Sequence, residues 1–114
     1  MKRAIAFDHT ETITRHPNVC REMIKSLASD RWSVYVLSGD PMDSIKRGVA
    51  AAGILEEWLV DIISRTDKGA ACEELQIDVL VDDDVNYISQ CTSRVLRLHV
   101  RGIECCVDKK RTGE

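Results

Sequence analysis

Short apolar segments alternate with amphipathic segments along this chain. Runs rich in apolar and β-branched residues predict buried strands at residues 3–7, 33–37, 59–64, 78–83 and 94–100. Helical spacing of apolar residues predicts helices at 18–29, within 38–53, at 66–75 and at 85–91. Strands that alternate with helices need crossover connections, so we expect an α/β fold with a parallel sheet and helices on both faces.

Turn and capping residues sharpen the boundaries of these elements. Asp40 and Pro41 are typical of the N-cap and first position of a helix, and Gly53 is typical of a residue just past a helix end. Neither an internal repeat nor a linker interrupts the alternation, which predicts one domain over residues 1–114. We expect the polar tail, residues 108–114, to be frayed.

Composition excludes several classes of function. A net charge of −3 gives no electrostatic case for binding nucleic acid or an anionic membrane. The apolar runs are far shorter than the ~20 residues that span a bilayer. The first residues do not have the apolar core of a secretory signal. The five cysteines are an odd number without a CxxC pair, which indicates reduced thiols and a cytoplasmic protein.

Polar side chains follow several predicted strands at the point where each strand ends. Asp8 follows the first strand, Ser38 the second, and Asp82 and Asp83 end the fourth, while Lys68 lies near the front of a helix. Ligands of open parallel sheets bind outside the carboxyl ends of the strands. We therefore expect these side chains to gather at one edge of the sheet.

Carboxylates, a hydroxyl and an ammonium at one edge of a sheet can bind a metal ion and a phosphoryl group. Carboxylates that meet at one edge repel each other, and a divalent cation such as Mg²⁺, which prefers oxygen ligands, removes that repulsion. A carboxylate such as Asp8 can attack phosphorus, while a hydroxyl and an ammonium, here Ser38 and Lys68, can hold the phosphoryl oxygens. Nucleophile, metal site, hydroxyl and cation together predict phosphoryl transfer.

The four segments also resemble a known family. In order along the chain they are "AIAFDHTETIT", "VYVLSGD", "RTDKGA" and "VLVDDD". Their order, and the kind of element on which each falls, are similar to the four motifs of the haloacid dehalogenase superfamily. The resemblance covers residues 3 to about 100. It implies a three-layer α/β/α sandwich around a five-stranded, Rossmann-like parallel sheet with strand order 5-4-1-2-3.

The resemblance also implies a role for each motif residue. Asp8 would be the nucleophile and a Mg²⁺ ligand, while Ser38 and Lys68 would bind the phosphoryl group. Asp83, with or without Asp82, and the backbone carbonyl of Thr10 would complete the metal site. The implied substrate is a phosphomonoester, hydrolysed through an aspartyl-phosphate on Asp8.

The first motif departs from the family pattern two residues after Asp8. Phosphatases of the family usually carry there an aspartate that protonates the leaving group and then activates water, and the residue here is Thr10. The glycine that usually follows is Glu11. A threonine hydroxyl is a poor acid or base near pH 7, so we expect slow turnover, with His9 or Glu11 as alternative proton donors. The alternative function is a catalytically weak or inactive module that binds metal and phosphate.

The gaps between the motifs are too short to hold a cap domain, which indicates a capless member with an open site. Such members act on large substrates or use a neighbouring subunit as a lid. The substrate can therefore be a small or macromolecular phosphate ester, and a homo-oligomer that covers the site is a further expectation. A phosphorylated receiver domain shares the carboxylates and the lysine, but its acidic pair precedes the phosphorylated aspartate, whereas Asp82 and Asp83 come last.

Overall fold

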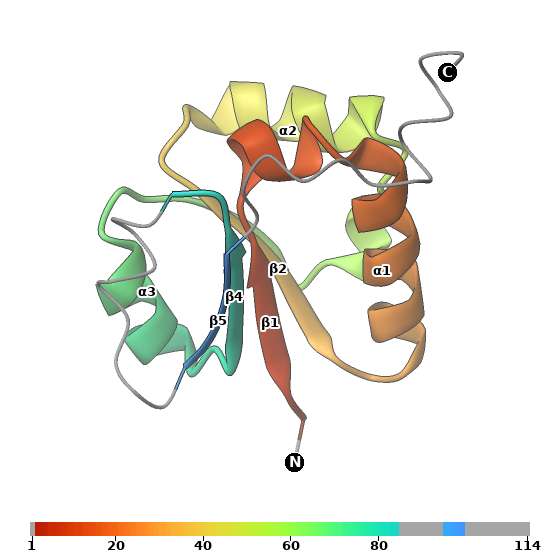
Figure 1. Cartoon of the computed structure of the whole chain (residues 1–114). Helices are drawn as coiled ribbons and strands as arrows, with labels where there is room; N and C mark the ends of the chain where they lie inside the picture. Colours follow the sequence, from red (N-terminus) through yellow and green to blue (C-terminus); the bar gives the residue numbers. More distant parts are fainter. Residues whose placement is uncertain (1, 85–94, 100–114) are drawn as a thin grey trace.

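A computed structural model describes residues 2–84 and 95–99 of the chain. Strands and helices alternate along it (Figure 1). The strands are β1 (Ala4–Phe7), β2 (Ser33–Ser38), β3 (Asp61–Ser64), β4 (Val79–Asp82) and β5 (Leu96–His99). The helices are α1 (Pro17–Ser29), α2 (Met42–Ala51) and α3 (Lys68–Leu75), with short helical turns η1 (His9–Ile13) and η2 (Glu56–Trp58). The predicted α/β class with a parallel sheet is confirmed.

The strands pair in the order β3-β2-β1-β4-β5, and each neighbouring pair is parallel. β1 lies between β2 and β4, with Ile5 opposite both Val34 and Val79. Sequence order therefore reverses at β1, because the chain moves outward to β2 and β3 and then returns to the other side of β1. Asp8 directly follows the strand at which this reversal occurs.

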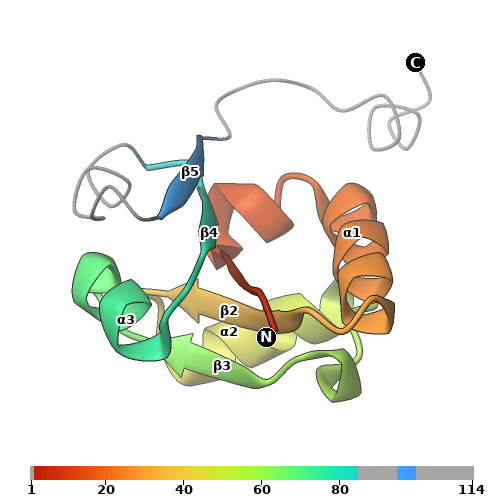
Figure 2. The same ribbon diagram turned by 90° about the horizontal axis from the view of Figure 1, so that it is seen from below.

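Alternation along the strands divides the core between the two faces of the sheet. Ile5 and Phe7 of β1 pack in one cluster with residues of α1 and α2, while Ala4 and Ala6 pack in a second cluster with residues of α3. Figure 2, which views the molecule from below, shows α3 and α1 on different sides of β1 and β4. Both faces of β1 are buried, as expected of a central strand in a parallel sheet.

The helices begin and end close to the predicted residues. α1 begins at Pro17, one residue earlier than predicted, and α2 ends at Ala51, two residues before Gly53. Gly53 has a φ of +77°, the left-handed conformation that glycine adopts without strain. The third strand begins at Asp61 and the third helix at Lys68, each two residues later than predicted.

Three predicted segments fall wholly or partly outside the described residues. The predicted helix at 85–91 and the tail at 108–114 lie there, as do the first and the last residue of the predicted strand at 94–100. Cys20 and Cys72 are buried and form no disulfide. Among the residues that the structure describes, no helix is both long enough and apolar enough to cross a membrane.

Candidate active site

The strand period brings Asp8, Asp82 and Lys68 to the same face of the sheet. Even-numbered residues of β1 and β4 point toward α3, so Asp8 continues the side of Ala6, and Asp82 continues the side of Leu80. The backbone amide of Asp8 donates to the carbonyl of Val81, which extends the pairing of the two strands past β1. Because Lys68 is the first residue of α3, its long side chain reaches this edge.

Lys68 joins the two carboxylates through a buried ion-pair network. Its Nζ atom lies 2.6 Å from Oδ1 of Asp8 and 2.7 Å from Oδ2 of Asp82. The three residues are 1%, 5% and 0% exposed, respectively. Buried charges of this kind persist only when they are paired and hydrogen-bonded, as these are. The network fixes the Asp8 carboxylate at the carboxyl end of the central strand.

The single positive charge of Lys68 does not fully balance the negative charge of the carboxylates around it. Burial raises the pKa of Asp8 to about 7, with a further rise from its hydrogen bond to Asp83, in spite of the opposing effect of Lys68. Burial likewise raises the pKa of Asp82. Burial alone would lower the pKa of Lys68, but hydrogen bonds and charge from Asp8 and Asp82 outweigh it and raise that pKa. The site therefore favours an additional positive charge.

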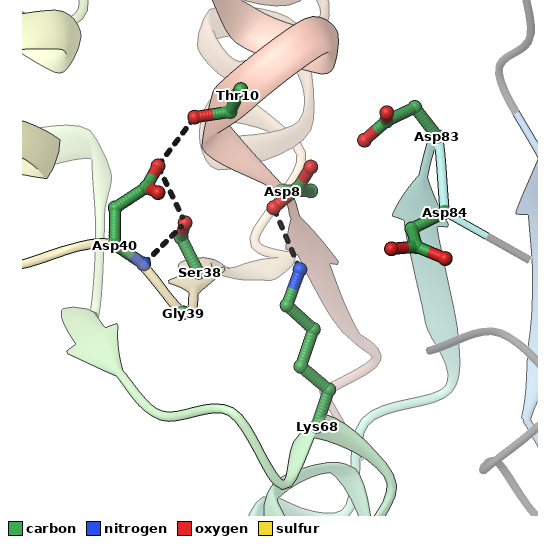
Figure 3. Close-up of a pocket in the computed structure, with 8 residues that line it drawn as sticks. All are labelled: Asp8, Thr10, Ser38, Gly39, Asp40, Lys68, Asp83 and Asp84. Carbon is green, nitrogen blue, oxygen red and sulfur yellow. Dashed lines mark hydrogen bonds and ion pairs between the residues drawn. The ribbon is translucent and has the colours of Figure 1, made fainter. Parts of the chain in front are cut away.

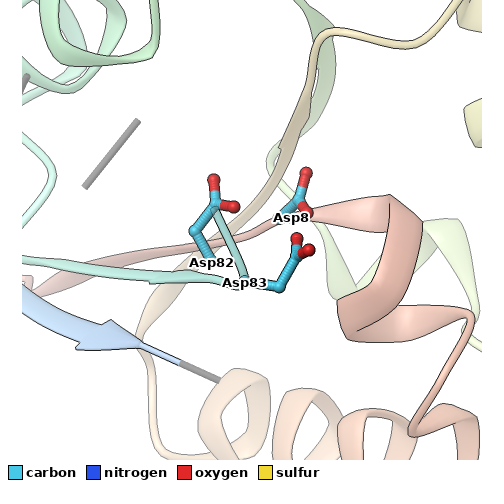
Figure 4. Close-up of side chains that lie close together, drawn as sticks. All are labelled: Asp8, Asp82 and Asp83. Atoms are coloured by element: carbon cyan, nitrogen blue, oxygen red, sulfur yellow. The ribbon is translucent and has the colours of Figure 1, made fainter. Parts of the chain in front are cut away.

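Asp83 completes an acidic group with Asp8 and Asp82. One carboxylate oxygen from each residue lies within 4.8 Å of the other two (Figure 4). Opposite ligands of Mg²⁺, at about 2.1 Å each, span about 4.2 Å, so a small contraction would bring the three oxygens to one ion. The set is composed of hard oxygen donors and has excess negative charge. These two properties are those of a group that could hold a divalent cation.

A pocket of about 240 Å³ opens beside the acidic group (Figure 3). This volume is below the range of drug-sized ligand sites and suits a small group such as a phosphoryl group. Its lining residues are Asp8, Thr10, Ser38, Gly39, Asp40, Lys68, Asp83 and Asp84. Asp82 is fully buried and does not line the pocket, but its ion pair with Lys68 connects it to this lining.

Asp40 lines the pocket and is a candidate functional residue, although the sequence pattern predicts that it caps a helix. The predicted N-cap role is wrong, because α2 is capped at Pro41 and the cap makes no side-chain hydrogen bond. Oδ2 of Asp40 accepts hydrogen bonds from Oγ1 of Thr10 at 2.5 Å and from Oγ of Ser38 at 3.1 Å. Nδ1 of His9 lies 3.0 Å from the same oxygen. The Thr10 and His9 contacts, in that order, lower the pKa of Asp40.

The alternative proton donors, His9 and Glu11, both belong to the loop after β1, and neither side chain lines the pocket. His9 is buried, its ring lies against Gly48 of α2, and its Nδ1 atom contacts Asp40. Glu11 is exposed and pairs with Arg15, at 3.4 Å between Oε2 and Nη1. Neither His9 nor Glu11 lines the pocket beside Asp8. Thr10 does line it, and the predicted role of its backbone carbonyl as a metal ligand stays a prediction.

The predicted site residues Asp8, Thr10, Ser38, Lys68 and Asp83 all line one pocket, and Asp82 is paired with Lys68 of that lining. They come from four segments of the chain, and the strand-end pattern predicted this meeting for Asp8, Ser38, Asp82 and Asp83. Comparison with known protein families gives no match, and neither does comparison with curated proteins.

Proposed function

We propose that this protein is a Mg²⁺-dependent phosphohydrolase of the haloacid dehalogenase type, which hydrolyses a phosphomonoester through an aspartyl-phosphate on Asp8. The observation that carries the proposal is the meeting of Asp8, Ser38, Lys68 and the Asp82–Asp83 pair around one small pocket. Support also comes from the fold. The central position of β1 and the strand order β3-β2-β1-β4-β5 are those that the resemblance implies for this class of enzyme.

Asp8, Asp82 and Asp83 would hold the cation. When bound, Mg²⁺ neutralises negative charge on the carboxylates and on the phosphoryl oxygens. Four carboxylates line the pocket, from Asp8, Asp40, Asp83 and Asp84, and Lys68 is the one ammonium among the lining residues. This balance would repel a phosphate dianion. We therefore expect phosphate esters to bind only after the cation.

Asp8 acts as the nucleophile in this proposal. One of its carboxylate oxygens forms a bond to phosphorus while the bond from phosphorus to the ester oxygen breaks, and the electron pair leaves with that oxygen. Lys68 holds the carboxylate in place at 2.6 Å and counters charge during the transfer. Ser38 is placed to contact a phosphoryl oxygen. Water then hydrolyses the acyl phosphate, which releases phosphate and restores Asp8.

The direct test is hydrolysis of p-nitrophenyl phosphate with and without Mg²⁺. This leaving group needs little protonation, so turnover does not depend on a strong general acid. We expect Mg²⁺-dependent turnover in the wild type and a loss of at least about 10²-fold in Asp8→Asn, with the fold retained. Asp30→Asn, an exposed change at the end of α1, is the matched control.

Two results would contradict the proposal. Unchanged Mg²⁺-dependent turnover in Asp8→Asn would remove Asp8 from the reaction. Failure of the wild type to turn over any of a panel of aryl and alkyl phosphates, with Mg²⁺ still bound at the acidic group, would favour the alternative of a metal- and phosphate-binding module. That alternative is supported by Thr10, because a hydroxyl alone is a weak catalyst of proton transfer.

A further inference from the structure

The hydroxyl of Thr10 and the carboxylate of Asp40 are directly joined at the wall of the pocket. Oγ1 of Thr10 donates to Oδ2 of Asp40 at 2.5 Å, and both residues line the pocket that Asp8 lines. In Figure 3 the pair lies on one side of Asp8, and Asp83 and Asp84 lie on the other. A group attached to Asp8 would therefore have the acidic group on one side and this pair on the other.

Several further contacts hold the Asp40 carboxylate in position. Its Oδ2 atom also accepts from Oγ of Ser38 at 3.1 Å, and Nδ1 of His9 lies 3.0 Å away. The backbone carbonyl of Asp40 accepts from Oγ of Ser64, at the end of β3. His9 in turn is buried against Gly48. Contacts from η1 and β2 thus fix the carboxylate, and the contact from β3 holds the backbone of Asp40, as a preorganised proton acceptor requires.

The direction of the hydrogen bond decides what Thr10 can do. Because its proton is donated to Asp40, the lone pairs of its oxygen remain available to accept a hydrogen bond from another molecule. A threonine hydroxyl is a poor base by itself, but an adjacent general base activates a hydroxyl in many enzymes. The arrangement is that of a hydroxyl backed by a carboxylate.

We propose that Thr10 and Asp40 form a proton-accepting dyad for the water that hydrolyses the aspartyl-phosphate. The inference rests on the proposed function and adds the residues that perform its second step. Neither the buried His9 nor the exposed Glu11 lines the pocket, whereas both members of the dyad do.

The step balances as a proton relay. The water oxygen forms a bond to phosphorus, and the bond from phosphorus to the Asp8 oxygen breaks, with its electron pair returning to the Asp8 carboxylate. The water gives one proton to Oγ1 of Thr10, and Thr10 gives its own proton to Oδ2 of Asp40. Asp40 later returns this proton to solvent or to the departing phosphate, so no oxidant or further reactant is needed.

The test separates the two chemical steps with p-nitrophenyl phosphate and Mg²⁺ in rapid mixing. Formation of the aspartyl-phosphate releases nitrophenol as a burst and needs little proton donation, whereas the steady-state rate needs water activation. In Asp40→Asn we expect the burst to persist and the steady-state rate to fall by about 10² to 10⁴-fold, the usual range for general base catalysis. Asp43→Asn, an exposed change on α2, is the control.

Thr10 variants test whether the two residues act as a unit. Thr10→Val removes the hydroxyl and is expected to slow the steady state as Asp40→Asn does, with the burst retained. The double variant should be no slower than either single variant, since residues that act together are strongly non-additive. Thr10→Ser, which restores a hydroxyl, should recover most of the turnover that Thr10→Val loses.

Three results would overturn the dyad, and they are distinguishable. If the wild type turns over and Asp40→Asn stays within about threefold of it, well below the 10²-fold expected of a base, the dyad is wrong and the proposed function stands. If Asp40→Asn loses burst and steady state in equal proportion, the residue only maintains structure. If the wild type shows no Mg²⁺-dependent turnover, the dyad falls together with the proposed function.

Discussion

The ammonium of Lys68 lies 2.6 Å from the carboxylate of Asp8, and both side chains are buried. The two residues are 60 positions apart, and their contact joins the end of the central strand to the start of α3. The same ammonium binds Asp82 at 2.7 Å, so one cation links the ends of two neighbouring strands. This network is the structural base of the candidate site.

Removal of the Lys68 charge should destabilise the fold strongly. Lys68→Met keeps a long apolar side chain but leaves Asp8 and Asp82 without their shared cation, and breaking a buried ion pair typically costs about 3 to 5 kcal/mol. Urea unfolding at pH 8 would measure the loss. Lys25→Met, an exposed change on α1, should alter stability by less than about 0.5 kcal/mol. A similarly small effect in Lys68→Met would show that the buried network does not exist.

Metal binding should depend on pH through Asp8. The pKa of Asp8 in the folded protein is about 7, above the ordinary value of 3.8. The protonated carboxyl therefore stabilises the folded state fully below pH 3.8, and this contribution to stability is lost as pH rises through 7. A cation competes with the proton that Asp8 then holds. Affinity for Mg²⁺ should therefore be about tenfold weaker at pH 6 than at pH 8, with release of up to one proton.

Calorimetric titration of the protein with MgCl₂, in buffers of different ionisation enthalpy, measures both the affinity and the proton release. Asp8→Asn should weaken binding and remove the pH dependence that Asp8 causes. Binding that is equally strong at pH 6 and pH 8, with no proton released, would contradict the assignment of Asp8 as a ligand.

Two residues with positive φ at helix ends should respond in opposite directions to substitution. Gln76, at the end of α3, has a φ of +55°, and Gly53, after α2, has a φ of +77°. Gln76→Gly should stabilise the protein by up to about 1 kcal/mol, because glycine adopts this conformation without a Cβ clash. Gly53→Ala should destabilise it by about 1 kcal/mol. Thermal unfolding of both variants measures the two changes in stability. If both variants were stabilised, or both destabilised, the left-handed geometry at one of the two positions would be contradicted.

Substitution of Gly48 by alanine should destabilise the protein, although Gly48 lies within a helix. A Cβ atom at this position would lie 1.8 Å from Nε2 of His9, so the buried ring would have to move away from Asp40. Gly48→Ala should therefore cost about 1 to 3 kcal/mol, the usual cost of overpacking, instead of the gain of about 1 kcal/mol that alanine brings to an open helix.

A double-mutant cycle with His9→Ala isolates this contact. Removal of the ring should relieve the clash, so the double variant should be more stable than the sum of the single effects predicts. Urea unfolding of the four proteins supplies the cycle. Additive effects, or stabilisation by Gly48→Ala alone, would show that His9 does not pack against α2.

The strand-end pattern predicts that Asp8, Ser38 and Asp82 meet, because the geometry of a parallel sheet is regular. Carboxyl ends of parallel strands share one edge, and that rule alone puts Asp8, Ser38 and Asp82 at the same edge. The period of two along β1 and β4 then explains why Asp8 and Asp82 both face the first residue of α3.

The sequence predicts the wrong role for Asp40 because the local residues favour a helix cap there. An aspartate before a proline is a common start of a helix, and the pattern contains no information about Thr10, which is 30 residues away. The contact depends on the path of the loop after β1, where Thr10 is extended and Glu11 has a φ of +64°. A long-range geometry of this kind follows from the folded backbone and not from residue spacing.

The central claim is that the phosphoryl group becomes attached to Asp8, and chemical trapping tests it most directly. Wild-type protein with Mg²⁺ and ³²P-labelled p-nitrophenyl phosphate is quenched in acid, and the labelled peptide is identified by mass spectrometry. Our account predicts label on the peptide that contains Asp8, removable by hydroxylamine as an acyl phosphate should be, and no label in Asp8→Asn. Label on another residue, or turnover without any trapped acyl phosphate and undiminished in Asp8→Asn, would contradict it.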